Sequence, residues 1–233
     1  MSRLIPLAAA IAFVAAAPTL AAERNFPTGG GFERLSNSTP FDVYVHTGKA
    51  PSVHAVGNDE ALNQLQIENR GGELHIGTKP GRWFSGWHWG RGGRARIDVT
   101  VPMISAANLS GPGNLTVDAV RTRAFSAHLS GPGNINVGMV EAGMIDVHLS
   151  GPGDISIAGR AERATMNLSG PGNIHASRLA LGDATVNLSG PGDIDATVSR
   201  TADVRLSGPG DVNIRGGARC SIHKSGPGSV NCG

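Results

Sequence analysis

The sequence predicts an all-β solenoid, in which one short structural unit is stacked on copies of itself. The motif Ser-Gly-Pro-Gly occurs seven times, beginning at Ser110, Ser130, Ser150, Ser169, Ser189, Ser207 and Ser225. Successive copies are 18–20 residues apart over more than half of the chain, and such a period indicates a repeat architecture. Apolar and polar residues alternate on both sides of every motif, which is typical of strands with one buried face.

Each repeat is interpreted as a strand, a corner, a second strand and a looser return of roughly eight residues. The proline and second glycine of the motif predict a type II turn, in which glycine supplies a positive φ. Two arrangements fit this unit, an antiparallel hairpin meander and a parallel β-helix. The β-helix is favoured because it stacks identical columns of Leu and Ile on one another, with coils ~4.8 Å apart.

Residues 1–22 have the features of a secretory signal peptide, with Arg3, an apolar stretch and small residues before the expected cleavage point. No other segment is long enough to span a membrane as an apolar helix. We therefore expect an exported protein, located in the periplasm or outside the cell at its surface. The net charge of +2 argues against a general nucleic-acid-binding role.

The remaining chain divides into three parts. Residues 23–31 are glycine-rich and are expected to form a flexible leader. Residues 32–104 alternate less regularly and are expected to form the first β coils and cap the core, and residues 105–233 form the regular coils. Cys220 and Cys232 both fall in inward columns of the last repeat. In an oxidising compartment they are expected to form a disulfide that closes the solenoid, since no zinc or thioredoxin spacing surrounds them.

The segments Phe41-Asp-Val-Tyr-Val-His-Thr-Gly and Gly72-Glu-Leu-His-Ile, followed by the repeated Leu-Ser-Gly-Pro-Gly-Asn/Asp-Ile, resemble the GIN-domain family of putative autotransporter adhesin heads. The resemblance covers roughly residues 32–233. It implies a right-handed single-stranded parallel β-helix that is exported to the bacterial envelope. It brings no catalytic residues with it, and this chain has proline where members of the family commonly carry the second serine of the corner.

A tryptophan- and arginine-rich segment at residues 81–94 is the first candidate binding site. Tryptophan faces stack on sugars or lie at lipid headgroups, and arginine pairs with phosphate or carboxylate. The expected ligand-binding residues are Trp83, Trp87, Trp89, Arg82, Arg91 and Arg94. The alternative is that these aromatic side chains fold back and plug the solenoid.

Outward carboxylates at Asp193, Asp195 and Asp211 form the second candidate site. Parallel stacking would bring Asp193 and Asp211 ~4.8 Å apart, and calcium could bridge them. The alternatives are neutralisation by Arg215 or a solvated polar ladder, which is favoured. Neighbouring histidines at 128 and 148 could share a metal ion, but an outward polar ladder is again the preferred interpretation. No other cofactor is expected.

The function predicted from these features is that of a non-enzymatic, adhesin-like binding module of the envelope. Its expected partners are a glycan, an anionic lipid or another envelope protein. One alternative is a purely structural scaffold that acts through a partner protein. The other is a carbohydrate-active enzyme, since β-helices also carry polysaccharide lyases and hydrolases, although fold alone does not establish such an activity.

Overall fold

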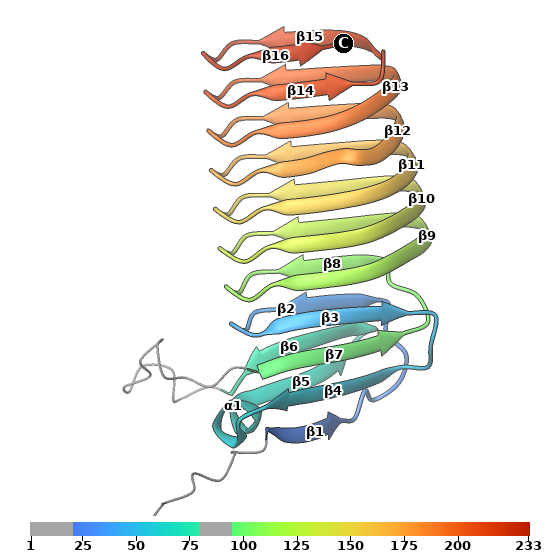
Figure 1. The fold of residues 1–233 in the computed structure, drawn as a ribbon, viewed down its shortest axis with the longest axis vertical. Coiled ribbons are helices and arrows are strands. Elements are labelled where there is room, and N and C mark those ends of the chain that lie inside the picture. The colour runs from blue at the N-terminus through green and yellow to red at the C-terminus, as the bar shows by residue number, and fades with distance from the viewer. Residues whose placement is uncertain (1–20, 80–94) are drawn as a thin grey trace, which may run out of the picture.

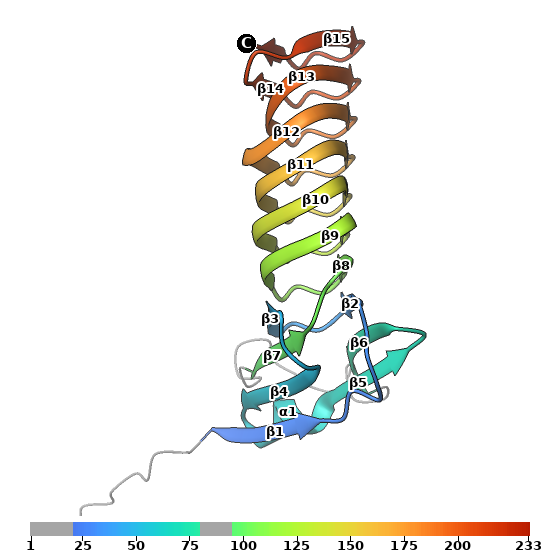
Figure 2. The ribbon, with the colours of Figure 1, turned by 90° about the vertical axis from the view of Figure 1, so that its right-hand side faces the viewer.

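The computed structural model describes residues 21–79 and 95–233 of the chain. All sixteen strands that it describes belong to one continuous sheet, which winds upward as a solenoid (Figure 1). The chain rises in a right-handed sense from the N-terminal region to the last coil (Figure 2). Helix is limited to a single short segment in this part of the chain, so the predicted all-β solenoid is confirmed.

The regular coils are built from parallel strands in register. Their strands are β8 (Ala106–Leu109), β9 (Leu115–Leu129), β10 (Ile135–Leu149), β11 (Ile155–Leu168), β12 (Ile174–Leu188), β13 (Ile194–Leu206), β14 (Val212–Arg215), β15 (Arg219–Lys224) and β16 (Val230–Cys232). Ile135 lies opposite Leu115 on one side and Ile155 on the other. The columns predicted from the sequence therefore stack as expected, and the hairpin meander is excluded.

The expected looser return is wrong, because the chain stays extended through it. Strand β9 continues for 15 residues and bends without leaving the sheet. Val120, inside the bend, pairs with Val140 of the next coil, and both side chains are buried. Each coil therefore has two long faces, which meet at a bend on one side and at the Ser-Gly-Pro-Gly corner on the other (Figure 1).

The glycines of the corners do not have the positive φ that a type II turn requires. Their role is to let successive coils approach closely. A Cβ on Gly151 would lie 2.6 Å from the carbonyl oxygen of Ser130 in the coil below, and this is backbone that cannot move aside. Glycine is thus needed at the corner for its small size and not for its backbone freedom.

The N-terminal region departs from the regular pattern. Its elements are β1 (Ala22–Phe26), β2 (Arg34–Asn37), β3 (Asp42–Thr47), β4 (Ser52–Gly57), α1 (Asp59–Gln64), β5 (Leu65–Arg70), β6 (Glu73–Thr78) and β7 (Ala95–Val101). Here β4 pairs antiparallel with both β1 and β7, and β5 pairs antiparallel with β6. The flexible leader expected from residue 23 is wrong for its first residues, because β1 forms an edge strand there.

Helix α1 covers the end of this region. The side chain of Asn58 caps it by accepting a hydrogen bond from the backbone N–H of Ala61 at 2.9 Å. Ala61 and Leu62 are fully buried against the core. The helix therefore shields apolar side chains below the first coils, as a cap must in a stacked fold.

An eighth corner precedes the seven that the sequence reveals. Strand β2 lies in register with β8, which places Asn37 opposite Leu109, and the chain then turns through Thr39 and Phe41 into β3. Asn37 is buried, and its side-chain oxygen accepts hydrogen bonds from the backbone and hydroxyl of Thr39. Thr39 and Phe41 occupy the two glycine positions of the motif.

The last coil is closed by the predicted disulfide. Cys220 of β15 and Cys232 of β16 are bonded, with Cα atoms 6.5 Å apart. Both side chains are half-buried against the core. Lys224 takes the place of leucine in this coil, opposite Leu206. The terminal coil thus combines a covalent link with a charged residue where the inner coils are apolar.

Candidate functional site: a polar groove and a histidine cluster

One outward column of side chains runs the length of the solenoid, just before the corners. In-register pairing aligns its members, which are Asn108, His128, His148, Asn167, Asn187, Arg205 and His223. The amide of Asn187 donates to the side-chain oxygen of Asn167 at 2.8 Å. The outward polar column predicted from the sequence is therefore present, and some of its side chains are hydrogen-bonded to one another.

A groove of about 890 Å³ follows this column from β10 to β15. Its walls are the outward side chains and the corner serines, and each leucine between them points inward, as Leu168 does. No Asp or Glu lines the groove among the described residues. Arg205 and Lys224 give its C-terminal end a positive character, although Asp203 lies 3.1 Å from the guanidinium of Arg205.

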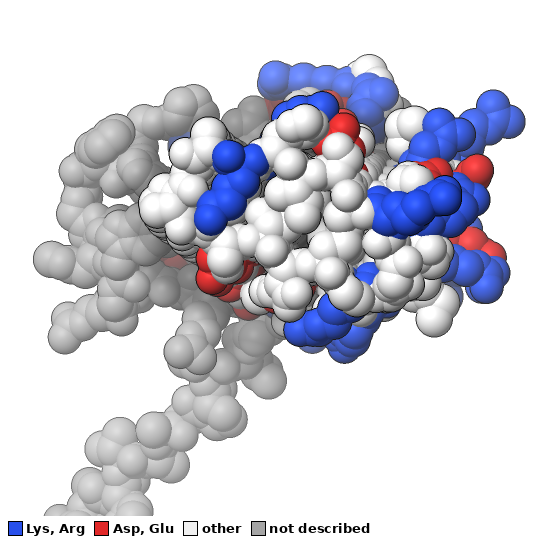
Figure 3. Space-filling view, turned by 90° about the horizontal axis from the view of Figure 1, so that it is seen from above, with Lys and Arg blue, Asp and Glu red and all other residues white. Residues whose placement is uncertain are grey.

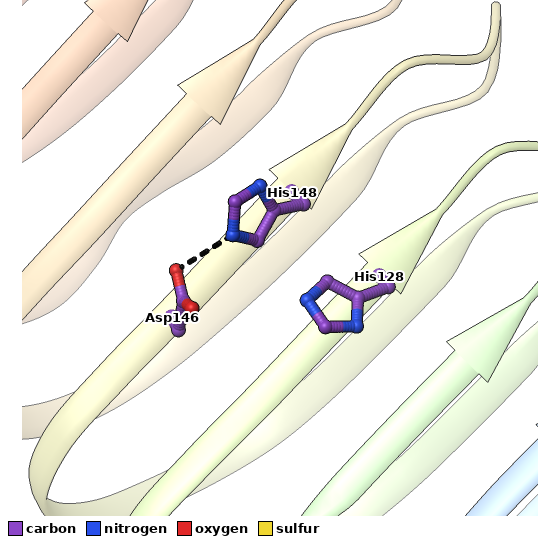
Figure 4. A group of neighbouring side chains, drawn as sticks. All are labelled: His128, Asp146 and His148. Carbon is purple, nitrogen blue, oxygen red and sulfur yellow. Dashed lines mark ion pairs between the residues drawn. The ribbon is translucent and has the colours of Figure 1, made fainter.

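Two histidines and one carboxylate meet beside the N-terminal end of this groove (Figure 4). His128 and His148 are partners in adjacent coils, and their ring centroids are 4.9 Å apart. Asp146 points to the same face, because it precedes His148 by two residues on β10. Its Oδ1 lies 3.0 Å from Nε2 of His148. This is the one group of three or more metal-ligating side chains found in the described part of the chain.

The electrostatics of the cluster favour a neutral imidazole at His128. Partial burial lowers the pKa of His128, and the neighbouring His148 lowers it further, while Asp146 acts in the opposite direction. A neutral imidazole has a free lone pair on one ring nitrogen. The cluster can therefore accept a hydrogen-bond donor or a cation. The two histidines were identified from the sequence, but Asp146 was missed. Its position two residues before His148 could have placed it on the same face of the strand.

Two of the aspartates proposed for calcium, Asp193 and Asp211, belong to a different column, which follows the corners. Oδ1 of Asp193 accepts the backbone N–H of Asp211 at 2.8 Å. Oδ1 of Asp211 in turn accepts both the N–H and the hydroxyl of Ser229, and these bonds lower the pKa of Asp211. Asp195 lies on the strand, 4.0 Å from Arg215. The three aspartates form no three-ligand group within the described residues, so calcium binding there stays a prediction.

The bend side of the solenoid is rich in arginine. Seen from the C-terminal end, many Lys and Arg side chains gather at the right, the side on which the strands bend (Figure 3). Several are paired: Arg121 lies 3.5 Å from Glu141, and Arg200 lies 2.6 Å from Asp183. The hydrogen bond from Arg200 lowers the pKa of Asp183. Acidic residues are thus interspersed along this edge, whereas the groove lining has none.

The tryptophan- and arginine-rich candidate site lies outside the described residues. This applies to Arg82, Trp83, Trp87, Trp89 and Arg91, and also to Arg94. No helix that the structure describes is long and apolar enough to cross a membrane.

Comparison with known proteins gives a consistent picture of the fold. The family described as "putative auto-transporter adhesin, head GIN domain" matches residues 31–218. No curated protein matches the chain in sequence. A solved putative adhesin from Bacteroides fragilis is similar with a TM-score of 0.83 and 20% identity, covering 91% of this chain and 97% of the other.

Two further solved structures share the architecture at lower similarity. A putative adhesin from Parabacteroides merdae has a TM-score of 0.70 and 15% identity, with coverage of 92% of this chain and 96% of that one. A putative lipid binding protein from Parabacteroides distasonis has a TM-score of 0.68 and 18% identity, with coverage of 93% and 98%. At these identities the likeness establishes the fold alone.

Proposed function

Because this chain belongs to the family described as "putative auto-transporter adhesin, head GIN domain", we propose that it is an exported, non-enzymatic binding module of the cell envelope. Its ligand is an extended anionic glycan that lies along the groove beside the corners. The observation that carries this proposal is the groove itself, which runs across the coils from β10 to β15 without a carboxylate in its described lining.

The chemistry of the groove suits a polar polymer. Serine hydroxyls and asparagine amides recur in successive coils and can bond to sugar hydroxyls. Arg205 and Lys224 add positive charge, which attracts carboxylate or sulfate groups through charge-assisted hydrogen bonds. A ligand that spans several coils would gain from many such contacts, each of them individually weak. The interspersed acidic residues of the bend make that edge less suitable for a polyanion.

A glycan array on the purified protein tests the proposal, with acidic and neutral polysaccharides compared at two salt concentrations. We expect acidic glycans to bind best and binding to weaken at high salt, because exposed charges are screened. Lys224→Glu and Arg205→Glu should each lower the affinity at least tenfold, which corresponds to about 1.4 kcal/mol. Arg178→Glu is the matched control, since it makes the same charge change at an exposed position on the bend side.

Equal binding by the groove variants and the Arg178→Glu control would contradict the groove as the binding surface. Trp87→Ala and Trp89→Ala belong in the same array, because they test whether the tryptophan-rich segment contributes to binding. A parallel assay for newly formed chain ends in the bound glycan tests the alternative of a carbohydrate-active enzyme. Turnover that survives purification would overturn the non-enzymatic proposal.

A further inference from the structure

The cluster of His128, Asp146 and His148 has features that the proposed function does not use. One possible ligand atom from each side chain lies within 4.8 Å of those of the other two. Oδ1 of Asp146 is shielded from solvent and makes no hydrogen bond of good geometry within the described chain, although Nε2 of His148 is 3.0 Å away. A shielded carboxylate oxygen without a hydrogen-bond partner is unusual and calls for an explanation.

We propose that His128, Asp146 and His148 bind one divalent transition-metal ion, with Zn²⁺ as the probe. Two imidazoles and one carboxylate are a ligand set that zinc accepts, with bonds of about 2.0–2.2 Å and a fourth position left for water or another group. Two ligands on a tetrahedral zinc ion lie roughly 3.3 Å apart. The 3.0 Å between Asp146 and His148 is close to that separation. His128 has to approach by a small side-chain rotation.

A hydrogen-bonded chain behind His128 determines which of its ring nitrogens carries the proton. Nδ1 of His128 lies 3.1 Å from Oδ1 of Asn108, an oxygen that can only accept. The amide nitrogen of Asn108 donates to Glu73 at 3.3 Å, which supports this orientation of the amide. Nδ1 therefore carries the proton, and the lone pair of the neutral ring is on Nε2. Histidine ligands of metals commonly donate their second ring nitrogen in this way.

His46, which has two acidic neighbours, lacks this convergence. His46 faces Asp98 with Nε2 at 3.7 Å and Asp118 with Nδ1 at 3.4 Å. Its two ring nitrogens point to opposite sides, so the two carboxylates cannot share one ion with it. His46 is therefore a control: it is a histidine beside aspartates, but its ring nitrogens do not converge with them on one point.

Isothermal titration of the untagged protein with Zn²⁺ tests the site. We expect a single ion per chain, and at least a tenfold loss of affinity in His128→Ala, His148→Ala and Asp146→Asn. His46→Ala should bind like the parent protein. Co²⁺ in place of Zn²⁺ should give visible ligand-field absorption that the cluster variants lose.

Each of the three side chains is on the outer face of its strand, so we expect the variants to fold, and thermal melts without metal verify this. Absence of Zn²⁺ binding by the parent protein would overturn the proposal. So would parent-like affinity in His128→Ala and His148→Ala, or loss of binding in His46→Ala alone. The result does not depend on whether the groove binds a glycan, since the probe is the metal alone.

Discussion

At the corners, the residue type is determined by the space between coils. The two glycines of each motif lie against the backbone of the preceding coil, as Gly151 does against Ser130. The first corner is different, because Thr39 and Phe41 occupy the same positions and are buried.

We expect Gly151→Ala to destabilise the solenoid by about 3 kcal/mol, the upper end of the range for overpacking. The added methyl would overlap backbone atoms of the coil below, and neither coil can move without disturbing its other neighbour. Ser150→Ala is the control, since Ser150 is exposed at the same corner. Thermal or urea unfolding of both variants measures the difference. A melting temperature of Gly151→Ala equal to that of the control would contradict the close stacking of the corners.

The roles of single residues could be predicted from the sequence only where the repeat defines the column in which each residue lies. The pairing of Cys220 with Cys232 was predicted because both fall in inward columns. The first corner was missed because its glycines are replaced and a long insertion separates it from the second. Asp146 was missed because its column contains Thr165 and Thr185 in the next coils, so no repeated pattern marks it.

At the scale of the element, a ladder of side chains joins the coils after each corner. The side-chain oxygen of an Asn or Asp accepts the backbone N–H of the equivalent residue in the next coil. Its members are Asp42, Asn114, Asn134, Asp154, Asn173, Asp193, Asp211 and, as the last donor, Ser229. The ladder satisfies a backbone donor at each point where the chain leaves the corner. This explains why the position is always Asn or Asp in the inner coils.

We expect Asn173→Ala to lower the free energy of unfolding by about 1–2 kcal/mol, because the N–H of Asp193 loses its acceptor. Asn173→Asp should cost less, since aspartate keeps the accepting oxygen and serves in the same column in other coils, but it removes the bond that the Asn173 amide donates to Oδ1 of Asp154 at 3.0 Å. Urea unfolding of the two variants distinguishes these cases. An equal loss of unfolding free energy in both variants would contradict the role of the ladder and would indicate that charge or packing determines stability at this position.

The regular strands were predictable because in-register stacking places like residues in contact, which imposes a visible pattern. The bends were less predictable. Pairing there shifts register between β11 and β12 and again between β12 and β13, so no fixed column runs through them. The antiparallel strands β1, β4 and β5 have no repeat to reveal their partners. Their pairing depends on long-range contacts that local alternation does not specify.

At the scale of the whole molecule, each coil contacts only the coils next to it. Solenoid stability is then a sum of coil and interface terms, and the ends are the weakest part. The N-terminal end is covered by α1 and the antiparallel strands, whereas Ile222 in the last coil is 45% exposed. The disulfide of the last coil therefore lies where the stack has the fewest stabilising contacts.

Reduction of the disulfide should loosen the C-terminal coil first and leave the inner coils folded. Closing a loop of 12 residues contributes about 2–3 kcal/mol in the chain-entropy description, and that stabilisation acts on β15 and β16. Hydrogen exchange measured by mass spectrometry should show faster exchange in these strands after reduction, with little change in β9 to β11. The Cys220→Ser/Cys232→Ser double variant should behave like the reduced protein and should not respond to reductant. Cooperative loss of protection along the whole solenoid would contradict this, because it would mean that the last coil supports coils with which it has no contact.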